Sequence, residues 1–235
     1  ATLLTLRAGP GAAAHVRELG LAPYDIACIP AAAGGPKGLA LIPFDKLLFR
    51  EWLQDPTPIE LIGASIGAWR MAALAMPDPV AALERLQRGS VRDQNYTAKP
   101  TPDDIAAACR RIGRGVLDGQ PLRVRPGVSL TIVTSRARGP LAGRESKLAF
   151  GHAVLSNTIS RDRLAAHLQR VLFTSDATFL AEPFDEFGSC VVGFTGANSE
   201  DALVASGTIP LICSPVRDIA GAPPGNYWDG ALVDY

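Results

Sequence analysis

One serine of the chain stands between two glycines in the pattern G-x-S-x-G, in the segment Gly63-Ala64-Ser65-Ile66-Gly67. The apolar run 59–63 before it predicts a buried strand, and the run of small residues 66–75 after it predicts a helix. At such a sharp strand-to-helix turn the flanking glycines relieve crowding, and the hydroxyl lies at the helix N-terminus, where N–H groups stabilise an oxyanion. The pattern predicts that Ser65 is the nucleophile of an acyl transfer. A glycine-bounded turn with a capping serine is the alternative.

A glycine-rich loop, Ala33-Gly34-Gly35-Pro36-Lys37-Gly38, directly follows the predicted strand 24–31. Consecutive glycines leave backbone N–H groups open to close approach by an anionic oxygen. The loop has neither the G-x-x-x-x-G-K-[ST] spacing nor a complete G-x-G-x-x-G, because Ala33 takes the first glycine position. Lys37 either adds a positive field or is solvated, and the sequence leaves both open.

A carboxylate near the end of the sequence is the candidate base. Asp229 lies in Trp228-Asp229-Gly230-Ala231, a segment that also suits an ordinary turn. If burial raises its basicity, a carboxylate within hydrogen-bond reach of a serine can accept the serine proton without a histidine.

The positions of the histidines bear on whether the serine acts with an aspartate alone or in a triad that includes a histidine. The chain has three of them, His15, His152 and His167, and none follows His167. A Ser, acid, His order would then need an acid between Ser65 and one of the last two histidines. The acids available there do not lie in convincing turns after strands: Asp103, Asp104, Asp118 and Glu145. His152 is the best rival base, and His15 and His167 lie in helical patterns.

Apolar runs and helical patterns alternate along the chain. Strands are predicted at 24–31, 59–63, 128–135 and 190–194, and helices at 39–53, 66–75, from Asp78-Pro79 to Gly89, 103–117, 161–175 and 201–207. Strands that are apolar on both faces indicate a sheet covered on both sides. We therefore predict an α/β fold, a three-layer α/β/α domain with a mostly parallel central sheet over residues 1–235. Segment 136–160 fits a surface excursion, a further strand or a lid.

Composition narrows the class of protein. Lys plus Arg and Asp plus Glu number 23 each, so net charge gives no reason to expect nucleic acid as a partner. No cysteine pair or histidine spacing suggests a metal site, and Cys28 and Cys190 lie in apolar runs that predict buried reduced thiols. We expect a cytoplasmic protein, since the sequence has no signal peptide and no apolar run that spans a bilayer.

Taken together, these segments resemble the patatin-like phospholipases. AGGPKG (33–38) is similar to the family's oxyanion loop, GASIG (63–67) to its nucleophile turn and DGA (229–231) to its aspartate motif. The run 202–216 is similar to the small-residue helix and Ile-Pro segment that precede that aspartate. Ala33 replaces a usual glycine, and the sequence ends six residues after Asp229, so we expect the domain to lack its C-terminal end.

The resemblance implies a lipid acyl hydrolase with a Ser65–Asp229 dyad and an acyl-enzyme, without metal or organic cofactor. It implies an oxyanion hole formed by the loop and the nucleophile turn, namely Gly34, Gly35, Lys37, Gly38 and Ile66. The partner would be a lipid or another acyl ester, met at a membrane or micelle in transient contact. Two alternatives stay open, a His152-dependent serine esterase and a non-catalytic module that binds an anion or a phospholipid head group.

Overall fold

The computed structural model describes residues 7–54, 58–92, 96, 98–142, 164–179 and 188–234. Its strands are β1 (Cys28–Ala31), β2 (Ile59–Ala64), β3 (Val128–Ala137), β4 (Leu168–Thr174), β5 (Cys190–Gly193), β6 (Val216–Arg217) and β7 (Asn226–Asp229). Its α-helices are α1 (Pro10–Leu19), α2 (Ile42–Leu47), α3 (Ile66–Ala75), α4 (Pro79–Val91), α5 (Pro102–Val116) and α8 (Ser199–Ser206). Short helical turns include η2 (Gly35–Leu41), η3 (Leu48–Trp52), η4 (Gly139–Leu141) and η6 (Gly230–Leu232).

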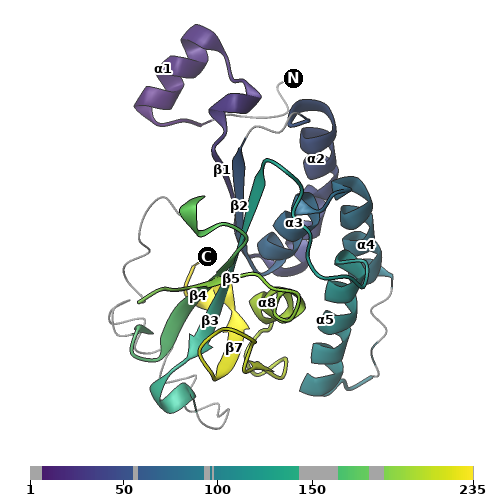
Figure 1. The fold of residues 1–235 in the computed structure, drawn as a ribbon. Coiled ribbons are helices and arrows are strands. Elements are labelled where there is room, and N and C mark those ends of the chain that lie inside the picture. The colour runs from purple at the N-terminus through teal and green to yellow at the C-terminus, as the bar shows by residue number, and fades with distance from the viewer. Residues whose placement is uncertain are drawn as a thin grey trace.

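The strands form one sheet with the path β1-β2-β3-β4-β5. Three of the four pairings along this path are parallel, and β4 runs antiparallel to β3. Helices α2 to α5 and α8 pack on one face of the sheet, as Figure 1 shows. The fold class is therefore α/β with a mostly parallel sheet flanked by helices, as predicted.

Residues that alternate along the strands separate the core into two clusters. Leu130 and Ile132 of β3 pack with the helices, whereas Val133 faces the other side, where it joins Leu172 and Trp228. Both faces of the central strands are buried, which explains the unbroken apolar runs that predicted them.

Most predicted elements occur near their expected places. The predicted helix 39–53 is helical as far as Trp52, in three successive elements, η2, α2 and η3, with Pro43 in the first turn of α2. Helix α4 continues past Gly89 to Val91, because Gly89 packs against Ile112 inside the helix pair rather than ending it. Arg136 and Ala137 extend β3 into the segment that we could not place, and most of the remainder, 143–160, lies outside the described residues.

The helix predicted at 161–175 is wrong over its second half. Residues Leu168–Thr174 form β4, paired with β3 from Ala137↔Leu168 to Thr131↔Thr174. Two polar side chains of this strand, Gln169 and Arg170, are buried and paired. Arg170 donates to Asp234 at 2.5 and 2.6 Å, and Gln169 accepts from Arg136 at 2.9 Å. A polar residue in such a pattern can therefore belong to a buried strand, where it pairs with another polar side chain, as well as to the solvent-exposed face of a helix.

The four cysteines carry free thiols, but Cys28 is exposed and Cys190 is partly buried. The prediction that both are buried is therefore wrong. The cause lies in the sheet path, because β1 and β5 are its two ends and each has a neighbour on only one side along it. An apolar run predicts a strand, but it does not tell a central strand from an end strand.

Candidate active site

The serine turn predicted at residues 63–67 is present. β2 ends at Ala64, α3 begins at Ile66, and Ser65 between them has φ 56° and ψ −130°, a conformation that residues with a Cβ rarely adopt. Gly67 lets the turn approach the end of β1, since a Cβ there would lie 2.1 Å from the carbonyl oxygen of Ala31. The side chain of Ser65 is thereby fixed at the N-terminus of α3.

The pairing of β3 explains how Asp229 reaches Ser65 across 164 residues of sequence. β2 pairs with β3 as far as Ala64↔Val133, and β7 begins its pairing at the next residue, Asp229↔Thr134. Because β4 occupies the other side of β3, β2 and β7 share one edge and run toward each other along it. Their C-terminal ends meet, and Ser65 and Asp229 stand at that junction.

The two side chains form a direct hydrogen bond. The Ser65 hydroxyl donates to Oδ2 of Asp229 at 2.7 Å, and the backbone N–H of Ala231 donates to Oδ1 at 2.8 Å. Ser65 is 6% exposed and Asp229 is 4% exposed. Burial raises the pKa of Asp229 from 3.8 to about 6, against the opposing effect of these two hydrogen bonds. Asp229 is therefore a stronger base than an ordinary aspartate, and it remains mostly ionised at neutral pH.

Ser206, the last residue of α8, supports this pair and was not predicted from the sequence. Its hydroxyl accepts the N–H of Ser65 at 3.0 Å and donates to the carbonyl of Val133 at 2.7 Å. Two residues later, the carbonyl of Thr208 accepts the N–H of Asp229 at 2.9 Å. Both members of the pair are thus held from α8. The only sequence signal for this role is the small-residue run 202–216.

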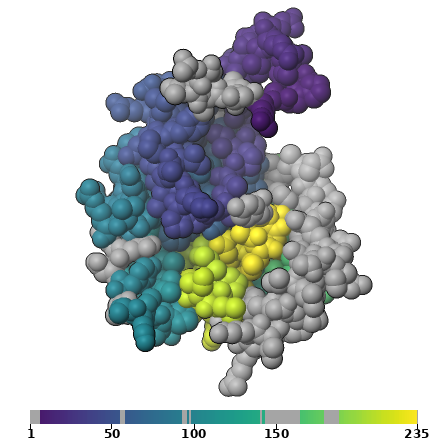
Figure 2. Space-filling model, turned by 180° about the vertical axis from the view of Figure 1, so that it is seen from behind, coloured from purple at the N-terminus to yellow at the C-terminus, as the bar shows by residue number. Residues whose placement is uncertain are grey.

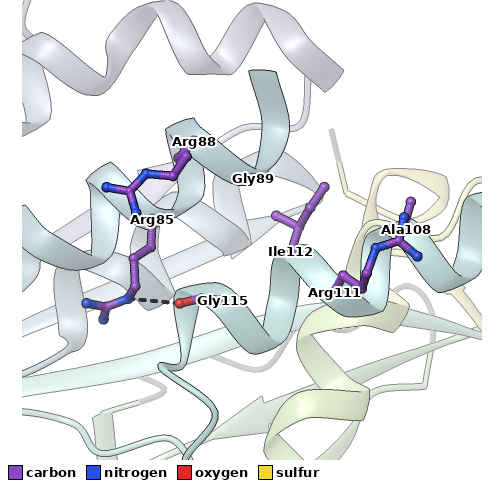
Figure 3. Close-up of a pocket in the computed structure, with 7 residues that line it drawn as sticks. All are labelled: Arg85, Arg88, Gly89, Ala108, Arg111, Ile112 and Gly115. Atoms are coloured by element: carbon purple, nitrogen blue, oxygen red, sulfur yellow. Dashed lines mark hydrogen bonds between the residues drawn. The ribbon is translucent and has the colours of Figure 1, made fainter. Parts of the chain in front are cut away.

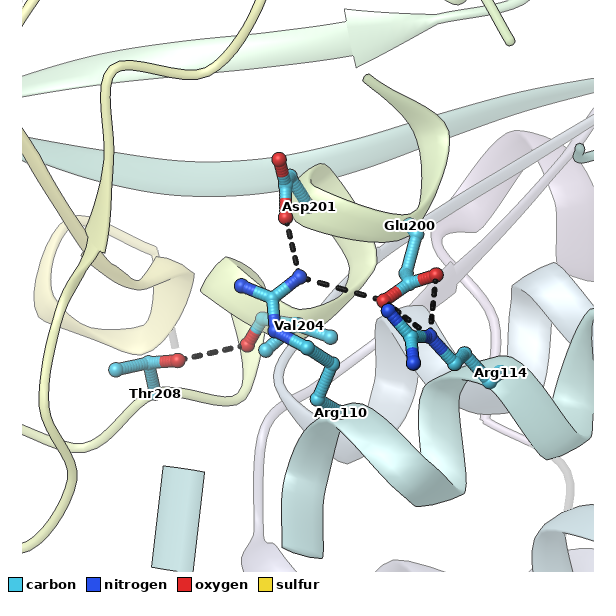
Figure 4. A network of polar contacts seen from close by, with 6 residues as sticks. All are labelled: Arg110, Arg114, Glu200, Asp201, Val204 and Thr208. Carbon is cyan, nitrogen blue, oxygen red and sulfur yellow. Dashed lines mark hydrogen bonds and ion pairs between the residues drawn. The ribbon is translucent and has the colours of Figure 1, made fainter. Parts of the chain in front are cut away.

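Ion pairs fix α8 on its neighbour α5. Arg110 donates to Asp201 at 2.5 Å and to Glu200 at 3.3 Å, and Arg114 donates to both oxygens of Glu200 at 3.0 Å (Figure 4). The two arginines are one turn apart on α5 and the two acids are neighbours in sequence at the start of α8, so two separate points of α5 hold the first turn of α8. The network thus secures the helix that carries Ser206.

The glycine loop packs directly against the serine turn. A Cβ on Gly38 would lie 2.6 Å from Cγ2 of Ile66, so only glycine lets η2 approach α3 this closely. Gly35, which begins η2, has φ +57°, and Gly34 precedes it. The side chain of Lys37 is exposed. The structure therefore brings Gly38 together with Ile66, the residue after Ser65, while Gly34 and Gly35 lie at the start of the same helical turn and Lys37 is exposed.

A second contact holds the loop and the turn together at a distance from the serine. Arg70 of α3 donates to both carboxylate oxygens of Asp45 in α2 at 2.6 Å, and both side chains are buried. A bidentate pair fixes orientation as well as distance. It locks the helix after the glycine loop onto the helix after the nucleophile.

The histidines of the described chain lie elsewhere. His15 of α1 contacts Asp25 at 3.0 Å. His167 precedes β4, next to Leu168, which pairs with Ala137 at the end of β3 farthest from β2. His15 therefore lies in a helix, as predicted, whereas the helical pattern predicted around His167 is wrong, because His167 lies in the turn before β4. His152, the rival base, lies outside the described residues.

An apolar hollow of about 410 Å³ opens beside the serine turn. It is lined by the end of β1 with the residue after it, the end of β2, and Val133 and Asp234. The residues from the first two regions are Pro30, Ala31, Ala32, Ile62, Gly63 and Ala64. The hollow adjoins the turn that carries Ser65, and most of its walls are hydrocarbon.

A different hollow, of about 300 Å³, lies between α4 and α5 and is lined by three arginines (Figure 3). Arg85 donates to the carbonyls of Gly115 and Val116 at 2.8 and 3.2 Å, so it satisfies the C-terminal end of α5. The guanidinium groups of Arg88 and Arg111 point away from each other in Figure 3. The three cations do not converge on one ligand, and we assign no binding role to this hollow.

The site defines a class of α/β protein with a serine turn after one strand and a buried aspartate after another. Residues 32–234 match the family model of the patatin-like phospholipase domain, and the chain belongs to this family. The family groups lipid acyl hydrolases, which are typically serine hydrolases that act on esters. Comparison with the curated proteins and with solved structures gives no match. No helix in the described ranges has the length and apolar character needed to cross a membrane.

Proposed function

We propose that this chain hydrolyses carboxylic esters of lipids, with Ser65 as nucleophile and Asp229 as its base. The observation that carries the proposal is the 2.7 Å hydrogen bond from the Ser65 hydroxyl to the buried Asp229 carboxylate. A serine is a weak nucleophile until a base removes its proton, and a carboxylate with a pKa of about 6 is suited to that transfer near neutral pH.

The reaction proceeds in two stages. Ser65 Oγ attacks the ester carbonyl while its proton passes to Asp229, and the protonated Asp229 then returns the proton to the departing alcohol oxygen. This leaves an acyl group on Ser65. A water molecule loses a proton to Asp229 and attacks the acyl carbonyl, and the proton returns to Ser65 Oγ as the fatty acid leaves.

The charge on the carbonyl oxygen needs donors during both stages. We assign this role to the backbone N–H groups of Gly34, Gly35 and Ile66. Ile66 is the first residue of α3, where N–H groups have no partner within the helix. Ser65 N–H is already bonded to Ser206, so it serves the turn rather than the substrate. Gly38 permits the close approach of the loop, and Lys37 adds positive charge at the surface.

The apolar hollow beside the turn is the region that we assign to the acyl chain. It adjoins Gly63 and Ala64, and its volume of about 410 Å³ falls within the range of ordinary ligand sites. Hydrocarbon walls favour a fatty acyl group over a polar acyl group.

Labelling with a fluorescent alkyl fluorophosphonate tests the proposal, with wild type compared to Ser65→Ala, Asp229→Asn and His152→Ala. We expect labelling to be lost in the first, strongly slowed in the second and retained in the third. Loss of labelling in His152→Ala with a labelled Asp229→Asn would instead establish the histidine-dependent esterase. A folded wild type without labelling, together with saturable binding of inorganic phosphate, would favour the binding module.

A further inference from the structure

Two segments that begin at the proposed active site expose large apolar side chains. The first is η2 with α2, which starts at Gly35 of the glycine loop. The second is the loop 207–214, whose Thr208 carbonyl accepts the N–H of Asp229. Figure 2 shows the dark blue segment that contains η2 and α2 directly above the yellow-green segment that contains this loop, with the yellow end of the chain beside both. The two segments therefore lie on one face of the molecule.

On the first segment the exposed residues follow the helical repeat. Leu41, Phe44 and Leu47 are 47%, 43% and 52% exposed, at successive spacings of three. Residues three apart lie on neighbouring positions of one helix face, so these side chains form a continuous stripe. The opposite face of the same segment is buried through Ile42 and Phe49. The segment thus has two apolar faces, one packed in the core and one directed at solvent.

On the second segment three aliphatic residues are exposed to a similar degree. Ile209, Leu211 and Ile212 are 43%, 44% and 49% exposed. Leu211 has φ 66°, a region that is strained for leucine, and the loop is fixed by Cys213 N–H donating to the carbonyl of Ile209 at 2.9 Å. A strained leucine held outward in a fixed loop is unfavourable in water unless its exposure serves a contact.

The charges around these residues favour one kind of contact surface. Between Gly35 and Arg50 the only acid is Asp45, which is buried in its ion pair with Arg70. Lys37 and Arg50 are exposed near the two ends of the stripe, and residues 207–214 carry no charge. Two acids lie just outside the segments, where Glu51 follows Arg50 and Asp103 accepts the hydroxyl of Ser214. An apolar surface with cations at its margin and no exposed acid among its own residues is complementary to a phospholipid interface.

We propose that Leu41, Phe44, Leu47, Ile209, Leu211 and Ile212 form a docking surface that inserts into the surface of a phospholipid aggregate. The inference rests on the proposed acyl hydrolase function, since it gives that site its route to substrate. Ser65 is 6% exposed, so an ester within a bilayer reaches it only if the face around it meets the lipid. A protein partner on the same surface would cover the site, whereas a lipid surface both binds there and supplies the substrate.

Vesicle binding tests this surface without any turnover. Flotation with vesicles of phosphatidylcholine and phosphatidylglycerol is measured in the Ser65→Ala background, alone and with Phe44→Ser or Leu211→Asn added. Asparagine tolerates positive φ, so the second change removes the apolar side chain without adding backbone strain. Leu19→Ser is the matched control, because Leu19 is 74% exposed but lies at the end of α1, a helix that precedes the glycine loop and has no buried residue.

We expect each docking variant to weaken vesicle binding on the order of tenfold, since each removes roughly half of a buried side chain's transfer free energy. The control is expected to bind as the parent does. With Ser65 present, the ratio of vesicle to soluble-ester hydrolysis should fall in the same variants. Unchanged vesicle binding in the docking variants, or an equal loss of binding in the control, would overturn the docking surface. The surface would also be overturned if the parent protein forms a dimer on gel filtration and the docking variants do not, because the exposed residues would then bind a second copy of the chain. Absence of ester hydrolysis with the vesicle pattern intact would refute only the proposed chemistry.

Discussion

Replacing Asp229 by asparagine is expected to stabilise the protein at neutral pH while it removes the base. Folding raises the pKa of this carboxyl from 3.8 to about 6, because 4% exposure leaves the charged form poorly solvated. A group whose folded pKa is raised stabilises the fold only in its protonated form. Its contribution is present below the unfolded pKa and is lost as pH rises to the folded pKa.

The size of the effect follows from that difference in pKa. The loss amounts to about 3 kcal/mol by pH 6 and stays constant above it, at about 1.4 kcal/mol for each pKa unit. Asparagine has the same shape, its Oδ1 can accept the N–H of Ala231, and its amide can donate to the Ser65 oxygen. It keeps the packing and removes the buried charge.

Urea unfolding at about pH 5 and about pH 7.5 measures this difference. The stability advantage of Asp229→Asn over wild type should grow by roughly 1.5 kcal/mol between the two pH values. Asp118→Asn, at an exposed carboxylate, is the matched control for the loss of one charge. An advantage that stays constant with pH, or that shrinks as pH rises, would refute the reasoning from burial.

Three further predictions test the dyad and its supports. Ester hydrolysis should rise with pH as one group with a pKa near 6 loses its proton, since Asp229 must be ionised to act as a base; a pH profile of kcat/KM that is flat from pH 5 to 8 would contradict it. Ser206→Ala removes the partner of the Ser65 N–H and of the Val133 carbonyl. Urea unfolding should therefore show a free energy of unfolding lower by on the order of 2 kcal/mol, and ester hydrolysis should show a lower kcat. An unchanged free energy of unfolding and kcat would show that Ser206 does not support the site. Gly67→Ala places a Cβ 2.1 Å from the Ala31 oxygen and should lower the melting temperature sharply, whereas Gly115→Ala, with nothing within 4 Å, should raise it slightly; equal melting temperatures would show that the close approach is not needed.

The parts of the site that sequence predicted are those encoded by neighbouring residues within one short segment. The serine turn needs only a strand, two glycines and a helix in succession, and 59–75 contains all of them. The glycine loop after β1 was predicted for the same reason, since its consecutive glycines directly follow the strand in the sequence. Helix α8 also ends at Gly207, as predicted, because glycine after a helix is a strong local stop.

The parts that failed depend on contacts far apart in sequence. β4 was predicted as part of a helix because the segment 161–175 has an amphipathic pattern, yet Gln169 and Arg170 are buried and their partners Arg136 and Asp234 are 33 and 64 residues away. Ser206 reaches Ser65 across 141 residues, and no local pattern marks a serine that will accept one particular N–H. β7 has four residues, too few for a periodic signal, so the sequence did not predict the strand that ends at Asp229.

The position of β7 also explains how an aspartate alone can be held in place for the proposed reaction. In a Ser-His-Asp triad the third residue orients the base. Here the backbone does so, because Asp229 is paired with Thr134 in the sheet, gives its N–H to Thr208 and receives the N–H of Ala231 on Oδ1. Its own carbonyl accepts the Ser135 hydroxyl at 3.0 Å. Since β2 ends one ladder position away on the same edge of β3, the distance between Ser65 and Asp229 is set by the sheet, and not by a mobile side chain between them.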